Sequence, residues 1–241
     1  MPPGRTASFY DLRDALALPG CPVCRLAADD ARRYLDGLLW EQVTDPGIRA
    51  KVRRARGFCR DHARGLDHAG ASLGAAILMQ DILQHALSTL ERARFQTPPP
   101  LSRRRVQETL DPAQPSSATA ELVDALTPEE PCPACARARE MEAIYLDSLV
   151  EQLLVKGGLL PAYRGSAGLC LPHFRMALAR VREPAIFRAL VEAQRGVWQE
   201  LEAGLREQIR KNDHRYHDEP WGAESDAWLR ALVAVSGGAP E

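Results

Sequence analysis

The sequence lacks long apolar runs and any stretch that resembles a secretion signal. Its longest nearly apolar segment, Gly70 to Met79, is far shorter than the roughly 20 residues that a membrane-spanning helix needs. The first residues, Met1 to Arg13, show no basic segment followed by an apolar run and a cleavage site. We therefore expect a cytoplasmic protein, in a reducing compartment, with no membrane partner.

The sequence also lacks a large excess of charge of either sign and the common catalytic motifs. The formal net charge of the 241 residues is −1, which argues against wholesale binding to a polyanion. The sequence contains no Gly-rich phosphate loop and no nucleophile elbow. No residue set indicates a substrate, so we expect a protein that is not an enzyme, although active sites can assemble from distant residues.

Strand patterns are scarce, since Val, Ile and aromatic residues do not alternate with polar ones. Ala, Leu, Arg and Glu dominate instead, and apolar residues recur at helical spacing, so the sequence predicts an all-α fold. Pro19-Gly20, Asp45-Pro46-Gly47 and Gly157-Gly158 are the expected helix breaks. The predicted helices span residues 8–18, 22–43, 59–90, 118–126, 132–155, 170–211 and 224–235.

What the sequence does contain is a repeated set of cysteine motifs. Cys21-Pro22-Val23-Cys24 and Cys59-Arg60-Asp61-His62 recur as Cys132-Pro133-Ala134-Cys135 and Cys170-Leu171-Pro172-His173, each displaced by the same 111 residues. Tyr34-Leu35-Asp36 also recurs, as Tyr145-Leu146-Asp147. A fixed offset over ligands and neighbours predicts an internal duplication whose two copies pack together.

Each copy supplies three cysteines and one histidine, a ligand set suited to tetrahedral Zn²⁺. Residues three apart at a helix start share one face, and the positive end of the helix dipole favours the thiolate form. All six cysteines belong to these motifs, which leaves none for a disulfide or a separate nucleophile. The predicted ligands of the two zinc ions are Cys21, Cys24, Cys59, His62, Cys132, Cys135, Cys170 and His173.

Three questions about these sites stay open. An iron–sulfur cluster also accepts cysteine and histidine ligands, and Cys-Pro-x-Cys resembles the dithiol of thioredoxin-type oxidoreductases, although the preceding strand of that fold is missing. We expect one site per half, but Cys21 and Cys24 could instead be completed by Cys170 and His173. Asp36 or Asp147 is a candidate to hydrogen-bond a ligand histidine from behind.

A basic segment lies beside the first set of motifs. Residues Arg49 to Arg64 carry seven Lys or Arg against one Asp. Arg53, Arg54 and Arg56 are therefore candidate anion-binding residues, with nucleic acid as a candidate partner. The second copy retains few of these charges, so an ordinary solvated helix face is the simpler interpretation.

The pattern predicts four segments along the chain. The first repeat covers residues 1–96, a Pro-, Arg- and Ser-rich linker covers 97–117, the second repeat covers 118–212, and a C-terminal tail with a short helix covers 213–241.

With these motifs, the chain resembles the bacterial domain-of-unknown-function family numbered 6062 along most of its length. The resemblance is carried by Gly20 to Cys24, Tyr34 to Asp36, Asp45 to Gly47, Gly57 to His62, Cys132 to Cys135 and Gly168 to His173. It implies a bacterial cytoplasmic protein with paired Cys/His motifs and no established substrate.

From the residues and this resemblance together, we expect a binding or scaffold protein with two structural zinc ions. Its partner is unknown, and a protein is one candidate. The alternatives are an iron–sulfur or thiol-based redox carrier or sensor, and a nucleic-acid-binding zinc protein.

Overall fold

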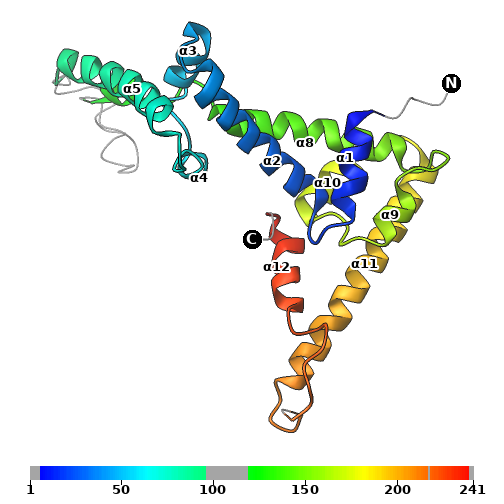
Figure 1. Ribbon diagram of the computed structural model, residues 1–241. Coiled ribbons are helices and arrows are strands. Elements are labelled where there is room, and N and C mark those ends of the chain that lie inside the picture. The colour runs from blue at the N-terminus through cyan, green and yellow to red at the C-terminus, as the bar shows by residue number, and fades with distance from the viewer. Residues whose placement is uncertain (1–5, 96–118, 217, 239–241) are drawn as a thin grey trace, which may run out of the picture. The chain divides into compact units, whose positions relative to one another are not determined.

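The regular secondary structure in the described part of the protein is helical. The computed structural model describes residues 6–95, 119–216 and 218–238, and within these ranges every regular element is a helix (Figure 1). The predicted all-α class is confirmed. The elements are α1 (Ala7–Leu16), α2 (Pro22–Gly37), the π-helical turn η1 (Leu38–Gln42), α3 (Pro46–Arg54), α4 (Arg60–Arg64), α5 (Ser72–Arg92), α7 (Ala120–Leu126), α8 (Pro133–Gln152), α9 (Leu160–Arg164), α10 (Leu171–Leu178), α11 (Pro184–Lys211) and α12 (Ala227–Ser236).

Contacts within the chain define two compact units. Unit 1 comprises residues 1–30 and 138–241, and unit 2 comprises residues 31–137. These units do not coincide with the two copies of the cysteine motifs, because each unit contains residues from both. The predicted linker at 97–117 lies outside the described residues, and the four-segment division stays a prediction.

Unit 1 is built on a core that joins helices distant in sequence. Phe9 and Leu12 of α1 belong to the same buried cluster as Leu146 and Leu149 of α8 and Leu190 of α11. Helix α12 packs on α10 and α11, as Figure 1 shows at the red end of the chain. Cys21 and Cys170 are members of this core, so the cysteine motifs are part of its packing.

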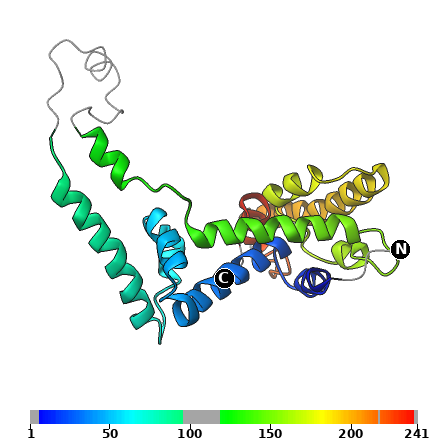
Figure 2. The same cartoon turned by 90° about the horizontal axis from the view of Figure 1, so that it is seen from above.

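Unit 2 has its own core around the end of α2 and the inner face of α5. Leu35, Leu38 and Leu39 pack with Val52 of α3 and Leu78 of α5. Helices α5 and α7 pack against each other and are seen together in Figure 2. The carboxylate of Asp81 on α5 accepts hydrogen bonds from Arg49 and Arg53 of α3, so ion pairs add to the contact between these helices.

Local sequence accounts for several helix starts. Asp45 caps α3, because its Oδ1 accepts a hydrogen bond from the Ile48 amide at 2.8 Å, and Pro46 follows in the first turn. Pro22 and Pro133 are the first residues of α2 and α8, where the missing N–H costs nothing. Each N-terminal cysteine of a Cys-x2-Cys motif therefore lies directly before a helix.

Two long predicted helices are in fact broken. The helix expected over residues 59–90 is divided into α4 and α5 by the segment from Gly65 to Ala71. The helix expected over 170–211 is divided into α10 and α11, since Pro184 disfavours helical backbone at the residue before it and begins α11 itself. Apolar periodicity continues across both breaks, so it did not reveal them.

Candidate metal centres

Cluster 1 is formed by Cys21, Cys24, Cys170 and His173 in unit 1. The Nδ1 atom of His173 lies 3.5 Å from the sulfur of Cys21, 3.3 Å from that of Cys24 and 3.2 Å from that of Cys170. The sulfurs of Cys24 and Cys170 are 3.7 Å apart. Four donor atoms therefore converge on one point, all within 4.8 Å of one another.

Cluster 2 is formed by Cys59, His62, Cys132 and Cys135 in unit 2. The Nδ1 atom of His62 lies 3.2 Å from the sulfurs of Cys59 and Cys135 and 3.7 Å from that of Cys132. The sulfurs of Cys59 and Cys135 are 3.6 Å apart. The donor set and the spacing match those of cluster 1.

These distances fit a single tetrahedral ion. A tetrahedral site with Zn–S bonds of about 2.3 Å holds its sulfurs about 3.8 Å apart, and sulfur–nitrogen separations are slightly shorter. The sulfur–sulfur separations of 3.7 Å and 3.6 Å in the two clusters agree with that edge length. All eight predicted ligand residues are thus placed in two groups that could each hold one metal ion.

The clusters combine the motifs across the two copies. Cys21 and Cys24 of the first copy are completed by Cys170 and His173 of the second, and Cys59 with His62 is completed by Cys132 and Cys135. Our expectation of one complete set within each half is therefore corrected. Packing explains the arrangement, because Cys21 and Cys170 share the core of unit 1 while Cys132 packs against the core of unit 2.

A glycine precedes each Cys-x2-His motif and turns the chain into the cluster. Gly57 and Gly168 lie two residues before Cys59 and Cys170, and both have positive φ angles, of 100° and 67°. Residues that carry a Cβ atom rarely adopt this backbone conformation, so the position favours glycine. The match of these two glycines in sequence therefore has a conformational cause.

In both clusters the neighbouring thiols and their burial change the pKa values of the cysteines. In cluster 1, contacts with the thiols of Cys170 and Cys24 lower the pKa of Cys21, whereas contacts with Cys170 and Cys21 raise the pKa of Cys24. In cluster 2, burial is the largest cause that raises the pKa of Cys135 to about 12. A thiolate at one cysteine thus disfavours ionisation of the neighbouring thiol. A dication would offset this repulsion by replacing the shared protons.

His173 is held by a carboxylate on its far side. Its Nε2 atom lies 3.5 Å from Oε1 of Glu142 on α8, while Nδ1 faces the sulfurs. Burial disfavours the charged imidazole, but contacts with the thiolates of Cys170 and Cys21 and with Glu142 raise the pKa of His173 to about 11. A carboxylate behind a ligand histidine fixes the ring orientation and increases its basicity.

The aspartates that we expected in this role lie elsewhere. Asp36 contacts Nε2 of His68 at 3.3 Å, and Asp147 pairs with Arg180 at 2.9 Å. The prediction for Asp36 and Asp147 was therefore wrong. The position that corresponds to Glu142 in the first copy is Ala31, so this copy has no carboxylate there.

The end of α12 adds a cover to cluster 1. The backbone amide of Gly238 donates a hydrogen bond to the sulfur of Cys24 at 3.3 Å. A Cβ atom on Gly237 would lie 3.5 Å from the sulfur of Cys170 and 3.7 Å from that of Cys24. The backbone at these two glycines therefore lies directly against the sulfurs, and an amide donor stabilises negative charge on Cys24.

Burial distinguishes the two clusters. Cys21, Cys170 and His173 expose 3%, 1% and 5% of their surface. The three cysteines of cluster 2 are half-buried. Solvent and small reagents can therefore approach the sulfurs of cluster 2 more readily than most donors of cluster 1.

The candidate anion-binding arginines are engaged in ion pairs. Arg53 pairs with Asp81 at 2.8 Å, Arg54 with Glu130 at 2.7 Å and Arg56 with Glu129 at 3.1 Å. A phosphate group would have to compete with these carboxylates, so the geometry adds no support to a nucleic-acid interface. Binding of an anion there stays a prediction.

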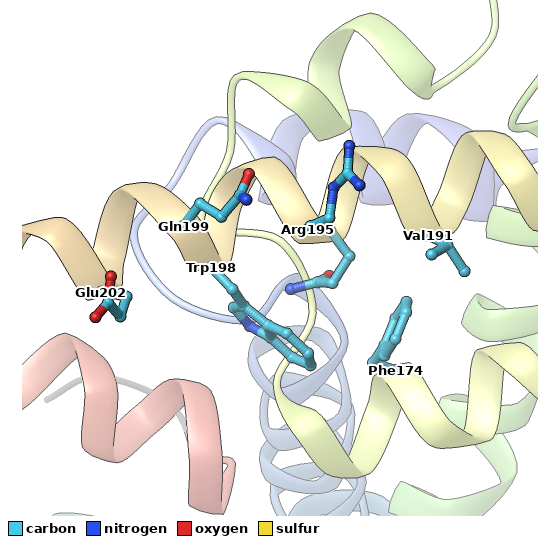
Figure 3. Close-up of a pocket in the computed structure, with 7 residues that line it drawn as sticks. Phe174, Val191, Arg195, Trp198, Gln199 and Glu202 are labelled. Carbon is cyan, nitrogen blue, oxygen red and sulfur yellow. The ribbon is translucent and has the colours of Figure 1, made fainter.

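A cavity of about 420 Å³ is lined in part by Phe174, the residue that follows His173 of cluster 1 in the sequence. Figure 3 shows Phe174 and Trp198 next to each other in its lining, and their rings meet edge to face with centroids 5.3 Å apart. The remaining lining residues are Val191, Gln194, Arg195, Gln199 and Glu202. The surface that this lining presents to the cavity is mainly apolar.

Two features of unit 1 had no signal in the sequence. Buried Gln194 accepts a hydrogen bond from the amide of Leu169 at 3.0 Å and donates one to its carbonyl at 3.1 Å. The hydroxyl of Tyr163 also donates to Gln194. These bonds hold the segment before Cys170, and neither Gln194 nor Glu142 stands in a local motif that could have marked it.

Comparisons with known proteins agree with the earlier resemblance. The model of a family of unknown function, DUF6062, matches residues 11–241. An uncharacterized 23.9 kDa protein in the xynA 3′ region of Caldicellulosiruptor sp. (strain Rt8B.4) is 22% identical over 223 residues, which cover 90% of this chain and 95% of that protein. No solved structure matches the chain. Among the described helices, none is both long and apolar enough to cross a membrane.

Proposed function

Because the chain belongs to the family of unknown function DUF6062, which has no assigned activity, we propose its role from the two clusters alone. We propose a non-enzymatic binding or scaffold protein whose helices are held by two structural zinc ions. The observation that carries the proposal is the convergence of four donors in each cluster, with sulfur–sulfur separations of 3.7 Å and 3.6 Å. Structural zinc sites are closed by four protein ligands, and each cluster offers four donor atoms.

Single-ion geometry favours zinc over an iron–sulfur cluster. A cluster of several irons binds its protein ligands on different metal atoms, which spreads those ligands apart. In both groups the four donor atoms lie within 4.8 Å of one another, which suits one central ion. Cys₃His is a common donor set for structural zinc.

The ions would contribute directly to folding. Cys21 and Cys170 are core residues of unit 1. Cys24 and Cys170, whose sulfurs are 3.7 Å apart, are separated by 146 residues of chain. Structural zinc contributes about 10–16 kcal/mol of apparent binding free energy in small zinc-finger peptides at neutral pH. Removing it would leave buried sulfurs in contact, and their negative charges would have to be neutralised by protons instead of by the ion.

The test is elemental analysis with an ultraviolet–visible spectrum on untagged protein purified without oxygen or chelator. The expected result is about two zinc ions per chain and no visible absorption. The variants Cys24→Ser and Cys135→Ser should each lose about one zinc ion, one from each cluster. Iron with a charge-transfer band, or full helicity and unchanged thermal stability after chelation, would contradict the proposal.

The half-burial of cluster 2 favours a second candidate function, that of a thiol-based sensor. Two of its thiolates, Cys59 and Cys135, have sulfurs 3.6 Å apart. With hydrogen peroxide as oxidant, they would lose two electrons and form one disulfide, the peroxide would take two protons and become two waters, and the bound ion would leave. Cluster 2 should then release its zinc before cluster 1, as followed with a chromogenic chelator. Equal release rates from both clusters would reject the sensor.

A further inference from the structure

Helix α5 of unit 2 is apolar on two opposite faces. Its inner face, with Leu78, packs in the core of the unit. Its outer face carries Leu73, Leu83, Leu87 and Leu90, which are 72%, 61%, 57% and 50% exposed. A helix that is apolar all round is normally buried on all sides. The exposure of this outer face is therefore unusual for its apolar composition.

The outer face has the spacing of a coiled-coil seam. Positions 73, 76, 80, 83, 87 and 90 alternate steps of three and four residues, and all six are exposed. They carry Leu, Ala, Gln, Leu, Leu and Leu. Such a 3-4 repeat brings one side chain per step onto a single stripe, which is the geometry of two helices packed along their length. We call these six residues the α5 seam.

The α5 seam is uncharged. From Leu73 to Leu90 the one formally charged side chain is Asp81, which is 12% exposed and is paired with Arg49 and Arg53 of α3. Gln80 is the polar residue of the seam, and a single polar residue at such a position sets the register of paired helices at some cost in stability.

We propose that the α5 seam is the interface with a second copy of this chain. A neutral stripe is self-complementary, because bringing two copies together opposes no like charges and buries leucine against leucine. Within the chain, the segment 96–118 closely follows α5 in the sequence and is an alternative occupant. It contains five prolines and, as large aliphatic residues, only Leu101, Val106 and Leu110, so its sequence does not offer an apolar helix of matching length.

The size of the α5 seam determines how strong the association is. Eighteen residues of helix, 73 to 90, span about 26 Å at a rise of 1.5 Å per residue. A stable interface uses roughly 20–30 residues on each side, and the six residues of the α5 seam fall well short of that, so the association is a weak one. The dimer should therefore dissociate on dilution, with a Kd in the range of about 1–100 µM.

Sedimentation velocity of the full, metal-loaded chain tests the proposal. The wild type should shift from monomer to dimer as its concentration rises from about 1 to 300 µM. The double variant Leu83→Glu/Leu87→Glu should stay monomeric over the whole range. The matched control Ile209→Glu/Leu229→Glu adds the same charge at residues that are 73% and 49% exposed in unit 1, and it should dimerise as the wild type does.

Circular dichroism and zinc content of each variant verify that the fold is retained. A wild type that is monomeric at every concentration would overturn the proposal. So would a dimer that Leu83→Glu/Leu87→Glu leaves intact. A monomeric wild type whose melting temperature falls on this double substitution would assign the α5 seam to cover by its own chain, again against the proposal.

Discussion

The two clusters differ in the single residue that lies behind the ligand histidine. Glu142 lies behind His173, whereas the corresponding residue of the first copy is Ala31. Replacing Glu142 with Ala should lower the zinc affinity of cluster 1 by about 10–100-fold, because the imidazole loses its orienting acceptor. Chelator competition on the purified protein measures the affinity, and cluster 2 should be unchanged.

Glu151→Ala is the matched control for this substitution, since Glu151 is an exposed residue of the same helix, α8. It should leave both affinities as they are. Equal weakening of the two clusters by Glu142→Ala would show a general loss of stability and would contradict a specific contact with His173.

Gly237 is the second residue whose identity matters for cluster 1. Its backbone has φ 79° and ψ −178°, a region that is essentially restricted to glycine. Gly237→Ala should therefore lower the free energy of unfolding by about 1–3 kcal/mol, although the added Cβ makes ordinary contacts with the sulfurs. Denaturant titration measures the change.

Gly196→Ala provides the opposite expectation on the same scale. Gly196 lies within α11, and a Cβ atom there would have no heavy atom within 4 Å. Alanine costs less backbone entropy than glycine, so this variant should gain about 0.5–1 kcal/mol. If Gly196→Ala and Gly237→Ala changed stability alike, backbone conformation would not be the cause.

Among the elements, α11 is connected to the cluster through one side chain. Gln194 binds both backbone groups of Leu169, the residue before Cys170, and accepts from the hydroxyl of Tyr163. Gln194→Leu leaves these buried groups without partners and should cost about 2–4 kcal/mol of stability. Denaturant unfolding measures it, and Gln199→Leu, at an exposed site of the same helix, should change stability by less than about 0.5 kcal/mol.

The contact between α3 and α5 should respond to acid. Hydrogen bonding with Arg53 is the main cause that lowers the pKa of Asp81 in the folded state. A carboxyl group with a lowered folded pKa contributes stability above its unfolded pKa, near 4, and this contribution is lost as the pH falls through the folded value. The stability difference between the wild type and Asp81→Asn should thus be constant above about pH 5 and shrink below pH 4.

Comparing two chains cancels the acid loss of metal, which affects both equally. A difference that is independent of pH in urea titrations between pH 3 and 6 would show that the Asp81 contact with Arg49 and Arg53 contributes no stability that depends on its charge.

Sequence reasoning was most successful where the signal is local. Pro22 and Pro133 marked the starts of α2 and α8, and the fixed offset marked all eight candidate ligands, whereas Asp45-Pro46-Gly47 indicated only a break and the start of α3 at Pro46 was not predicted. It could not choose between pairing within or across the copies, because both pairings use the same residue types at the same spacing. Glu142 and Gln194 act through contacts between distant segments, which leave no pattern along the chain.

For the whole molecule, cross-pairing means that neither copy owns a complete ligand set. A chain with a site-specific protease sequence inserted between Ser116 and Ser117 can be cut into two fragments after folding. We expect the fragments to co-elute in size-exclusion chromatography, because each cluster takes two ligands from each fragment and the core of unit 1 also joins them. Removing metal should weaken this association.

Fragments that separate while each retains its own zinc ion would contradict cross-pairing and restore the arrangement of one site per copy. An otherwise identical chain that is left uncut provides the elution standard, and mass spectrometry under non-denaturing conditions counts the ions.

Cross-pairing also sets an order of assembly during synthesis on the ribosome. Cys59 meets its partner Cys135 after 76 residues, but Cys24 must wait 146 residues for Cys170. At about 5–20 residues per second, these intervals are about 4–15 s and 7–30 s. The ligand set of cluster 2 is thus complete first, while the earliest thiols of the nascent chain, Cys21 and Cys24, are exposed to oxidants and to competing metals for longest.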